Sequence, residues 1–143
     1  MVATRYAVAL HILLLLACQR RTGPATSQLI ADSVNTNPVV VRRITGQLSR
    51  AGLVRVRRGP GGAELTRSPQ QITLADVWQA MNTGKSATVL PLHACPNLEC
   101  PVGREVHAVL GRAFETAELA MLQALRRTTL ASLIETLPLP AVA

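Results

Sequence analysis

The residues from Asn35 to Leu65 constrain the fold of this chain more than any other segment. Asn37 is suited to cap a helix, and Pro38 to fill its first position, where a missing N–H costs nothing. Apolar residues then recur at helical spacing, arginines fall off that face, and Gly52 can adopt the positive φ that ends a helix. Valine next alternates with arginine, as in a half-buried strand, and a Gly-Pro-Gly-Gly turn leads into a second short strand. The segment therefore predicts a helix over about residues 37–50 followed by a β-hairpin.

A shorter helix is expected just before this one. Ser27 can cap it, it would run to about Val34, and Asn35-Thr36 would make a tight turn. Two helices joined by a tight turn, the second of them basic, are typical of a helix-turn-helix, and the hairpin makes the motif winged. The sequence thus predicts a winged helix-turn-helix, in which the exposed start of the second helix enters the major groove of DNA.

The candidate DNA contacts follow from this geometry. Arginine forks suit both phosphates and guanine edges, so Arg42 is the first choice for reading a base and Arg43 is equally suited to a phosphate. A valine can meet a thymine methyl group. The full set of DNA-binding candidates is Asn37, Val39, Arg42, Arg43, Arg57, Arg58 and Ser27, with Thr26 and Arg5 as further phosphate contacts.

Charge divides the chain into two parts. The net charge is +7, and residues 1–67 carry ten arginines against two acidic residues, whereas residues 68–143 carry five basic residues against six acidic ones. A basic part joined to a near-neutral part indicates that only the first meets a polyanion.

Composition and cysteine usage narrow the class of protein further. Aromatic residues make up only 2% of the chain, so the core must be built from aliphatic side chains, which suits helices. Three cysteines, Cys18, Cys95 and Cys100, are too few for a disulfide framework and favour a reducing, cytoplasmic location. The apolar run from Tyr6 to Cys18 looks like a signal peptide, but it is too short for a membrane span, which needs ~20 residues. We expect a buried first helix over about residues 3–19, with Cys18 as an inert core residue and no membrane partner.

The second half predicts three more helices. Thr73, with Asp76 three residues on, resembles a capping box, and Thr129 can cap a short final helix. Between them, apolar residues at helical period from Arg104 to Arg127 predict a long helix. The small winged domain has little surface to cover this stripe, so we expect the long helices of two chains to pair, with packing inside one chain as the alternative. A two-fold dimer would place two recognition helices about one DNA turn apart, which matches an inverted-repeat operator.

Six blocks spread over almost the whole chain belong together: TRYAVALHILLLLA, NPVVVRRI with AGLV, RGPGGAEL, ITLADVWQAM, HACPNLECPVG and TLASLIETL. In combination they resemble the Rrf2 family of bacterial transcription regulators, the group of IscR, NsrR, CymR and YwnA-like proteins, and the YwnA-like branch most of all. The resemblance implies a mainly α-helical protein with a small hairpin wing and a long C-terminal dimerisation helix. It also implies a dimeric repressor that is released by a signal, and it places Arg58 over or in the minor groove. The implied division is a winged helix-turn-helix domain at 1–81, a Cys/Pro-rich sensing loop at 82–103, and a dimerisation helix with a short helix at 104–143.

The sensing loop carries the residues capable of further chemistry. It contains His93, Cys95 and Cys100, with His107 just beyond, whereas cluster-binding relatives carry three cysteines in this loop. One interpretation is an iron–sulfur cluster with mixed Cys/His ligation or with a ligand from the partner chain. Another is a thiol switch, in which Cys100, near the start of the long helix, is the more reactive thiol. In the third, both cysteines only pack, there is no cofactor, and either the signal is something else or the protein senses nothing.

Enzymatic activity is not expected, because the chain has no phosphate-binding glycine loop, no Ser/His/Asp arrangement and no HExxH motif. The sequence therefore predicts a sequence-specific DNA-binding regulator, a dimeric repressor that responds to a redox or small-molecule signal. The alternative function is a nucleic-acid or protein binding module that uses a winged helix without operator-specific DNA binding.

Overall fold

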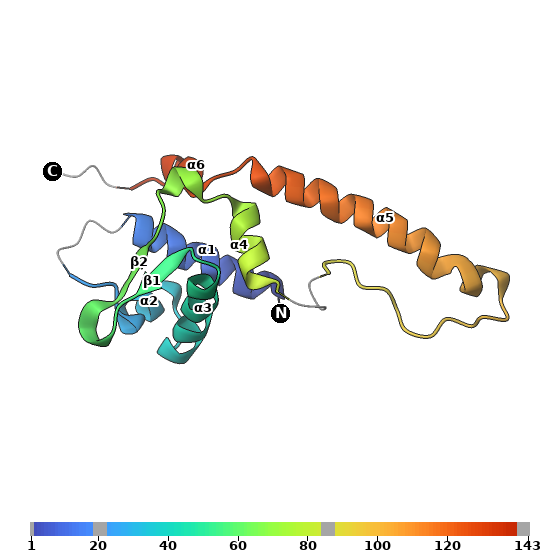
Figure 1. Cartoon of the computed structure of the whole chain (residues 1–143), viewed down its shortest axis with the longest axis horizontal. Coiled ribbons are helices and arrows are strands. Elements are labelled where there is room, and N and C mark those ends of the chain that lie inside the picture. The colour runs from blue at the N-terminus through green and yellow to red at the C-terminus, as the bar shows by residue number, and fades with distance from the viewer. Residues whose placement is uncertain (1, 19–22, 84–87, 140–143) are drawn as a thin grey trace.

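The computed structural model describes residues 2–18, 23–83 and 88–139 (Figure 1). Within them the fold is mainly helical, with one small antiparallel hairpin, as the sequence predicted. The elements, in chain order, are α1 (Val2–Cys18), α2 (Ser27–Val34), α3 (Pro38–Arg50), β1 (Val54–Val56), η1 (Gly59–Gly61), β2 (Ala63–Leu65), η2 (Pro69–Gln71), α4 (Leu74–Met81), α5 (Pro101–Arg126) and α6 (Leu130–Thr136).

The core is aliphatic and lies between α1, α2, α3 and α4. Ile12 and Leu13 of α1 are fully buried, as are Ile30 of α2 and Leu48 of α3. The expected buried first helix is thus confirmed. Among the described residues no helix is long and apolar enough to cross a membrane. The prediction for Cys18 was wrong: it lies at the end of α1, where the core stops, and is partly exposed.

The helix-turn-helix formed as predicted, with one correction. The Oδ1 atom of Asn37 accepts the N–H of Val40 at 3.0 Å and so caps α3. The cap of α2, however, is Thr26, whose hydroxyl accepts the N–H of Leu29 at 3.2 Å. Ser27 was the predicted cap, but it is already helical, whereas Thr26 has the extended backbone that a cap requires.

The wing is a hairpin whose register pairs Val54 with Leu65, Arg55 with Glu64 and Val56 with Ala63. Ala25 adds a further bridge, because its carbonyl accepts the N–H of Ala63 at 3.1 Å. The predicted half-buried alternation holds for Val54, which is 2% exposed, and fails for Val56, which is 52% exposed. The reason is that the hairpin runs outward beyond the core after its first residue.

The helices α4 and α6 begin side by side. Both capping residues behave as predicted: Thr73 forms a capping box with Asp76, and Thr129 forms one with Ser132. The N–H of Leu74 donates to Thr128 and the N–H of Leu130 donates to Ile72, both at 2.9 Å. These bonds return the chain to the core after α5, and Leu130 is fully buried there.

The helix α5 extends away from the rest of the molecule (Figure 1). It begins at Pro101, three residues earlier than predicted, with Cys100 as its N-cap. Proline at the first helical position explains the earlier start, because its missing N–H costs nothing there. None of the residues of α5 is buried, and Val102 and Val109 are 71% and 64% exposed. The apolar stripe of α5 is therefore not buried inside this chain.

Candidate nucleic-acid interface

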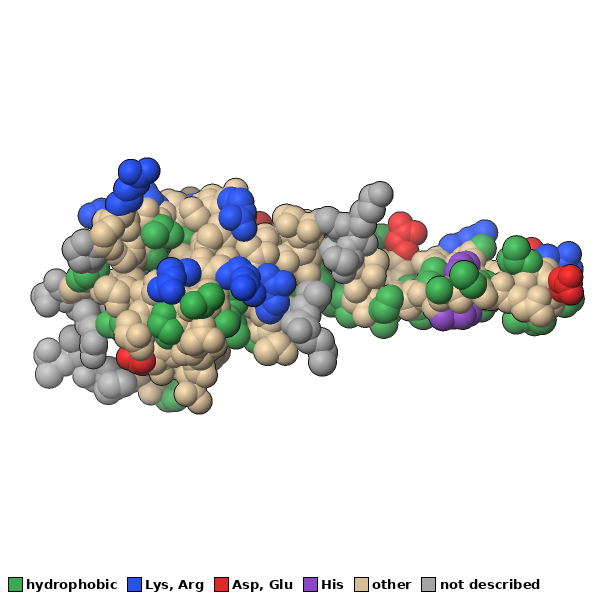
Figure 2. All heavy atoms as spheres, turned by 90° about the horizontal axis from the view of Figure 1, so that it is seen from below, with side chains coloured by type: hydrophobic (Ala, Val, Ile, Leu, Met, Phe, Trp, Pro, Cys, Tyr) green, Lys and Arg blue, Asp and Glu red, His purple; other side chains and the backbone are tan. Residues whose placement is uncertain are grey.

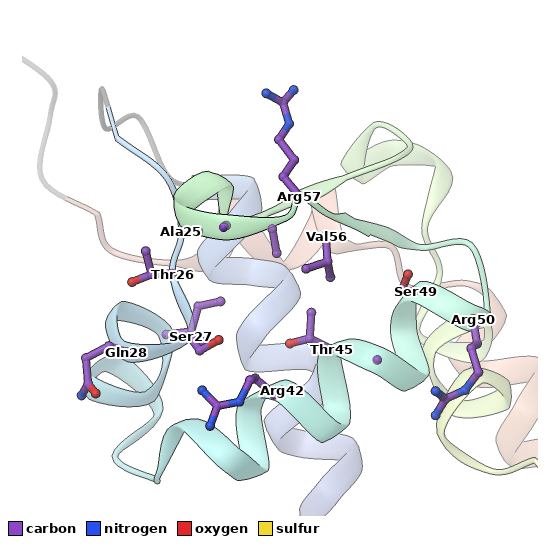
Figure 3. Close-up of a pocket in the computed structure, with 15 residues that line it drawn as sticks. Ala25, Thr26, Ser27, Gln28, Arg42, Thr45, Ser49, Arg50, Val56 and Arg57 are labelled. Carbon is purple, nitrogen blue, oxygen red and sulfur yellow. The ribbon is translucent and has the colours of Figure 1, made fainter.

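An open groove of about 680 Å³ lies between the start of α2, the exposed face of α3 and the wing (Figure 3). Its residues come from all three parts of the winged helix-turn-helix. The lining includes Thr26, Ser27 and Gln28 from α2, Arg42, Thr45, Ser49 and Arg50 from α3, and Val56, Arg57 and Gly62 from the wing. Three of these lining residues are arginines and none is acidic, so the groove is positively charged. Such a groove attracts a polyanion.

The helix α3 presents its predicted contact residues on the outside. Arg42 and Arg43 are exposed, Val39 is 55% exposed, and Arg42 extends toward the start of α2 (Figure 3). The opposite face is buried through Val41, so the helix can be approached from the arginine side. Because Asn37 uses its side-chain oxygen as the cap of α3, only its amide nitrogen is left to donate to DNA.

The face on which α3 lies is basic over the globular part of the molecule (Figure 2). Arg5 of α1 lies next to α3, because its Nη2 atom donates to Oε1 of Gln47 at 2.6 Å. At the start of α2, the hydroxyl of Thr26 is engaged in capping, while Ser27 lines the groove. The predicted phosphate contacts from α1 and from the start of α2 therefore lie next to α3.

The wing contributes three arginines, two of which contact the same carboxylate. Arg57 lines the groove, and its guanidinium contacts Oε1 of Glu64 at 3.1 Å. Arg55 contacts the same oxygen at 2.6 Å, whereas Arg58 is exposed at the start of the wing tip. The hydrogen bond from Arg55, and next the one from Arg57, lower the pKa of the Glu64 carboxyl. Sequence reasoning missed Arg55 and Glu64, although a cross-strand register placed on the Gly-Pro-Gly-Gly turn could have found the pair.

The predicted sensing loop runs back along α5. Oε1 of Glu118 accepts the N–H groups of Val89 and Leu90 at 2.9 and 3.0 Å. Further along, Nε2–H of His107 donates to the carbonyl of His93 at 2.7 Å, and the two rings meet edge to face. Each of these bonds joins the loop to α5, so the segment from residue 88 to residue 100 lies along the helix like a strap.

The four candidate sensing residues are only partly brought together. His93 and His107 are in contact, and Cys95 and Cys100 are both exposed. Cys95 has φ 51°, a left-handed conformation that is uncommon for a residue other than glycine. Within the described parts of the chain, no three His, Cys, Asp or Glu side chains gather as a possible metal site. An iron–sulfur cluster takes four protein ligands, so these side chains do not fit such a cluster within one chain.

Comparison with known proteins agrees with this geometry. The Rrf2 family, described as an iron-dependent transcriptional regulator, matches residues 2–136. YwnA of Bacillus subtilis (strain 168), whose name describes it as an HTH-type transcriptional regulator, is 41% identical over 121 residues, which cover 85% of this chain and 87% of YwnA.

Solved structures are similar over most of this chain. A crystal structure described as a DNA-binding protein is 37% identical, with a TM-score of 0.71, over 91% of this chain and 98% of the other. CymR, the global cysteine regulator of B. subtilis, is 25% identical, with a TM-score of 0.64, over 94% and 95%. IscR of T. potens, at 22% identity and a TM-score of 0.67 over 92% and 84%, shares the fold. With a winged helix, a basic groove and a family match over nearly its whole length, this chain belongs to the Rrf2 family of transcriptional regulators.

Proposed function

We propose that this protein is a cytoplasmic, homodimeric repressor that binds an inverted-repeat operator in double-stranded DNA and has no enzymatic activity. The observation that carries the proposal is the positively charged groove between α2, α3 and the wing. A DNA duplex is negatively charged and so complements the arginines of this groove, and the exposed side of α3 borders the same groove.

Each candidate side chain then has a role. The start of α3 enters the major groove, where Arg42 reads a guanine edge and Val39 meets a thymine methyl group. Arg43 holds a phosphate on the same strand. The remaining candidates position the duplex through its backbone: Ser27 and Asn37 at the helix starts, Arg57 on the wing beside the groove, and Arg58 at the minor groove beside the wing.

The proposed dimer rests on α5. With 26 residues it is about 39 Å long, and its exposed apolar residues recur at spacings of three and four. The stripe consists of six exposed residues, Val102, Val109, Ala113, Ala117, Ala120 and Ala124, and the partly exposed Val106. Small side chains of this kind let two helices approach closely, and burial against a second copy would remove the stripe from water. Residues 104–143 would then form the dimerisation part, 1–81 the DNA-binding domain and 82–103 the sensing loop, of which the last three residues already belong to α5.

The proposed signal is oxidation of the two loop thiols. Both are exposed, so an oxidant can reach them, and Cys100 is the N-cap residue of α5. A peroxide would take two electrons and two protons from Cys95 and Cys100, within one chain or between chains, and leave a disulfide and water. The disulfide would alter the strap along α5 and with it the spacing of the two recognition helices. A cluster would need ligands from the partner chain, and a small molecule at the strap is the other candidate signal.

The DNA-binding proposal is tested by footprinting the protein on the region upstream of its own gene. A protected inverted repeat is expected. Arg42→Ala should weaken binding to that repeat by about 1–3 kcal/mol, whereas Arg104→Ala, which removes the same charge from the start of α5, should leave it nearly unchanged. Equal losses in both variants, or no protected repeat, would favour the binding module over the repressor.

The redox proposal needs protein purified without oxygen. Iron and sulfide are assayed first, and a stoichiometric cluster would contradict the thiol switch. Operator affinity is then measured before and after mild peroxide treatment, which we expect to lower it reversibly. If Cys100→Ser responds to peroxide as the wild-type protein does, Cys100 is not the switch. The matched control is Cys18→Ser, which removes the thiol that lies outside the loop.

A further inference from the structure

Two arginines of the wing share one carboxylate oxygen. Nε and Nη2 of Arg55 donate to Oε1 of Glu64 at 2.9 and 2.6 Å. The same atoms of Arg57 donate to it at 3.3 and 3.1 Å. The hairpin register explains the arrangement, because Arg55 lies directly opposite Glu64, and Arg57 is its diagonal neighbour on the same face. A single negative charge thus engages two positive charges on one face of the wing.

The two arginines are not held equally. Both contacts of Arg57 are longer than those of Arg55, and Arg57 is the one that adjoins the groove, although its guanidinium extends away from it (Figure 3). Its stem lies directly against Gly61, where an added Cβ would overlap the Cβ of Arg57. Arg57 can therefore exchange the carboxylate for a phosphate by turning its guanidinium, while its stem stays in place.

All three side chains are accessible to solvent. The side chains of Arg55 and Arg57 are 66% and 61% exposed, and that of Glu64 is 37% exposed. An exposed ion pair of this kind contributes little to folding stability. Folding therefore does not explain why a carboxylate stands between two arginines on the wing, where it would repel a duplex that the wing contacts.

We propose that Glu64 is a specificity-determining residue, an internal counter-charge that keeps Arg57 from binding DNA phosphates unless the operator is in place. This inference rests on the proposed DNA-binding function. On a random duplex, a phosphate near Arg57 has to displace Glu64 and is repelled by it, so Arg57 adds little to the binding free energy. On the operator, the base contacts of α3 fix the register of the duplex and hold one phosphate where it can replace Glu64 as the ion-pair partner of Arg57. The wing then adds to specific binding much more than to non-specific binding.

The test is Glu64→Gln, which keeps the shape and an acceptor oxygen but removes the charge. Affinity is measured by fluorescence anisotropy for the footprinted operator duplex and for a scrambled duplex of the same length and composition, at several salt concentrations. Releasing one arginine should raise affinity for the scrambled duplex about fivefold at low salt and steepen its log–log salt dependence by about 0.9. Affinity for the operator should rise by less, so the ratio of the two affinities should fall.

A charge-matched control separates this mechanism from a general change in net charge. Asp32→Asn removes one negative charge from the same domain at an exposed residue whose side chain is bonded to Gln28. It should change both affinities equally and leave their ratio unchanged. Adding Arg57→Gln to Glu64→Gln should cancel the gain on the scrambled duplex, because the released arginine is then absent.

Two results would overturn the proposal. One is an unchanged affinity ratio in Glu64→Gln, and the other is an equal fall of the ratio in Asp32→Asn. In both cases the wild-type protein still prefers its operator, so only the role of Glu64 fails. A wild-type protein that binds the operator and the scrambled duplex equally would instead refute the proposed repressor, and with it the role of Glu64.

Discussion

Gly62 of the wing packs against the backbone of Ala25, just before α2, and both residues line the groove. Substitution of Gly62 therefore tests whether this contact shapes the groove. Its φ is 67° and its ψ is −158°, a region that is essentially restricted to glycine. A Cβ there would lie 2.7 Å from both the backbone N and O of Ala25. These are backbone atoms, so Gly62→Ala can be accommodated only if the wing moves away from Ala25.

The cost of Gly62→Ala can be worked from these contacts. The backbone conformation alone costs about 1–3 kcal/mol for a residue with a side chain. Moving the wing also breaks the 3.1 Å hydrogen bond from Ala63 to Ala25, which is worth about 1 kcal/mol. We expect the free energy of unfolding to fall by about 2–4 kcal/mol in total. Since Ala25 and Gly62 both line the groove, operator affinity should fall as well.

Gly59→Ala is the matched control for this substitution. Gly59 also has φ 67°, but a Cβ there would meet nothing within 4 Å. It should lose only about 1 kcal/mol, from the left-handed backbone. Both variants are unfolded with urea at one fixed protein concentration, because the stability of the proposed dimer would depend on concentration. Equal losses in the two variants would refute the reasoning, since the contact with Ala25 would then contribute nothing.

Three further predictions concern single side chains. Burial raises the pKa of Tyr6 to about 12. The free energy of unfolding should therefore decline as the pH rises from about 10, where Tyr6 of the unfolded chain ionises, toward about 12. Tyr6→Phe should remove this decline, and the absorbance of the chain's one tyrosine reports the titration directly. The Glu64 carboxyl has a lowered pKa, so its ion pairs are fully formed above the ordinary carboxyl range and are lost as the pH falls through the lowered value, with little effect on stability because the pairs are exposed. In an NMR titration Arg55→Gln should move the midpoint of Glu64 upward, and an unmoved midpoint would contradict the assigned cause. Glu118→Ala should speed hydrogen exchange of the N–H groups of residues 89–90, which lose their acceptor, and unchanged exchange would show that the strap is held elsewhere.

Local chemistry made the helical part of this fold predictable. Asn37, Thr73 and Thr129 cap their helices as expected, because a cap depends on residues only three positions away. The buried face of α3 and the exposed position of Arg42 also follow from helical period alone. The two errors at helix starts, Ser27 in place of Thr26 and Arg104 in place of Pro101, are shifts of one and three residues between neighbouring candidates.

The groove itself was decided by the tertiary structure. The sequence determined the parts: a basic helix, a glycine-rich wing, a long apolar-striped helix and a loop with two cysteines. Which of these parts touch was set by contacts between distant residues, such as Ala25 with Ala63 and Arg5 with Gln47. Periodicity and capping describe each segment by itself, whereas the sharing of Glu64 by two arginines and the exposure of the α5 stripe depend on how folded segments meet in space.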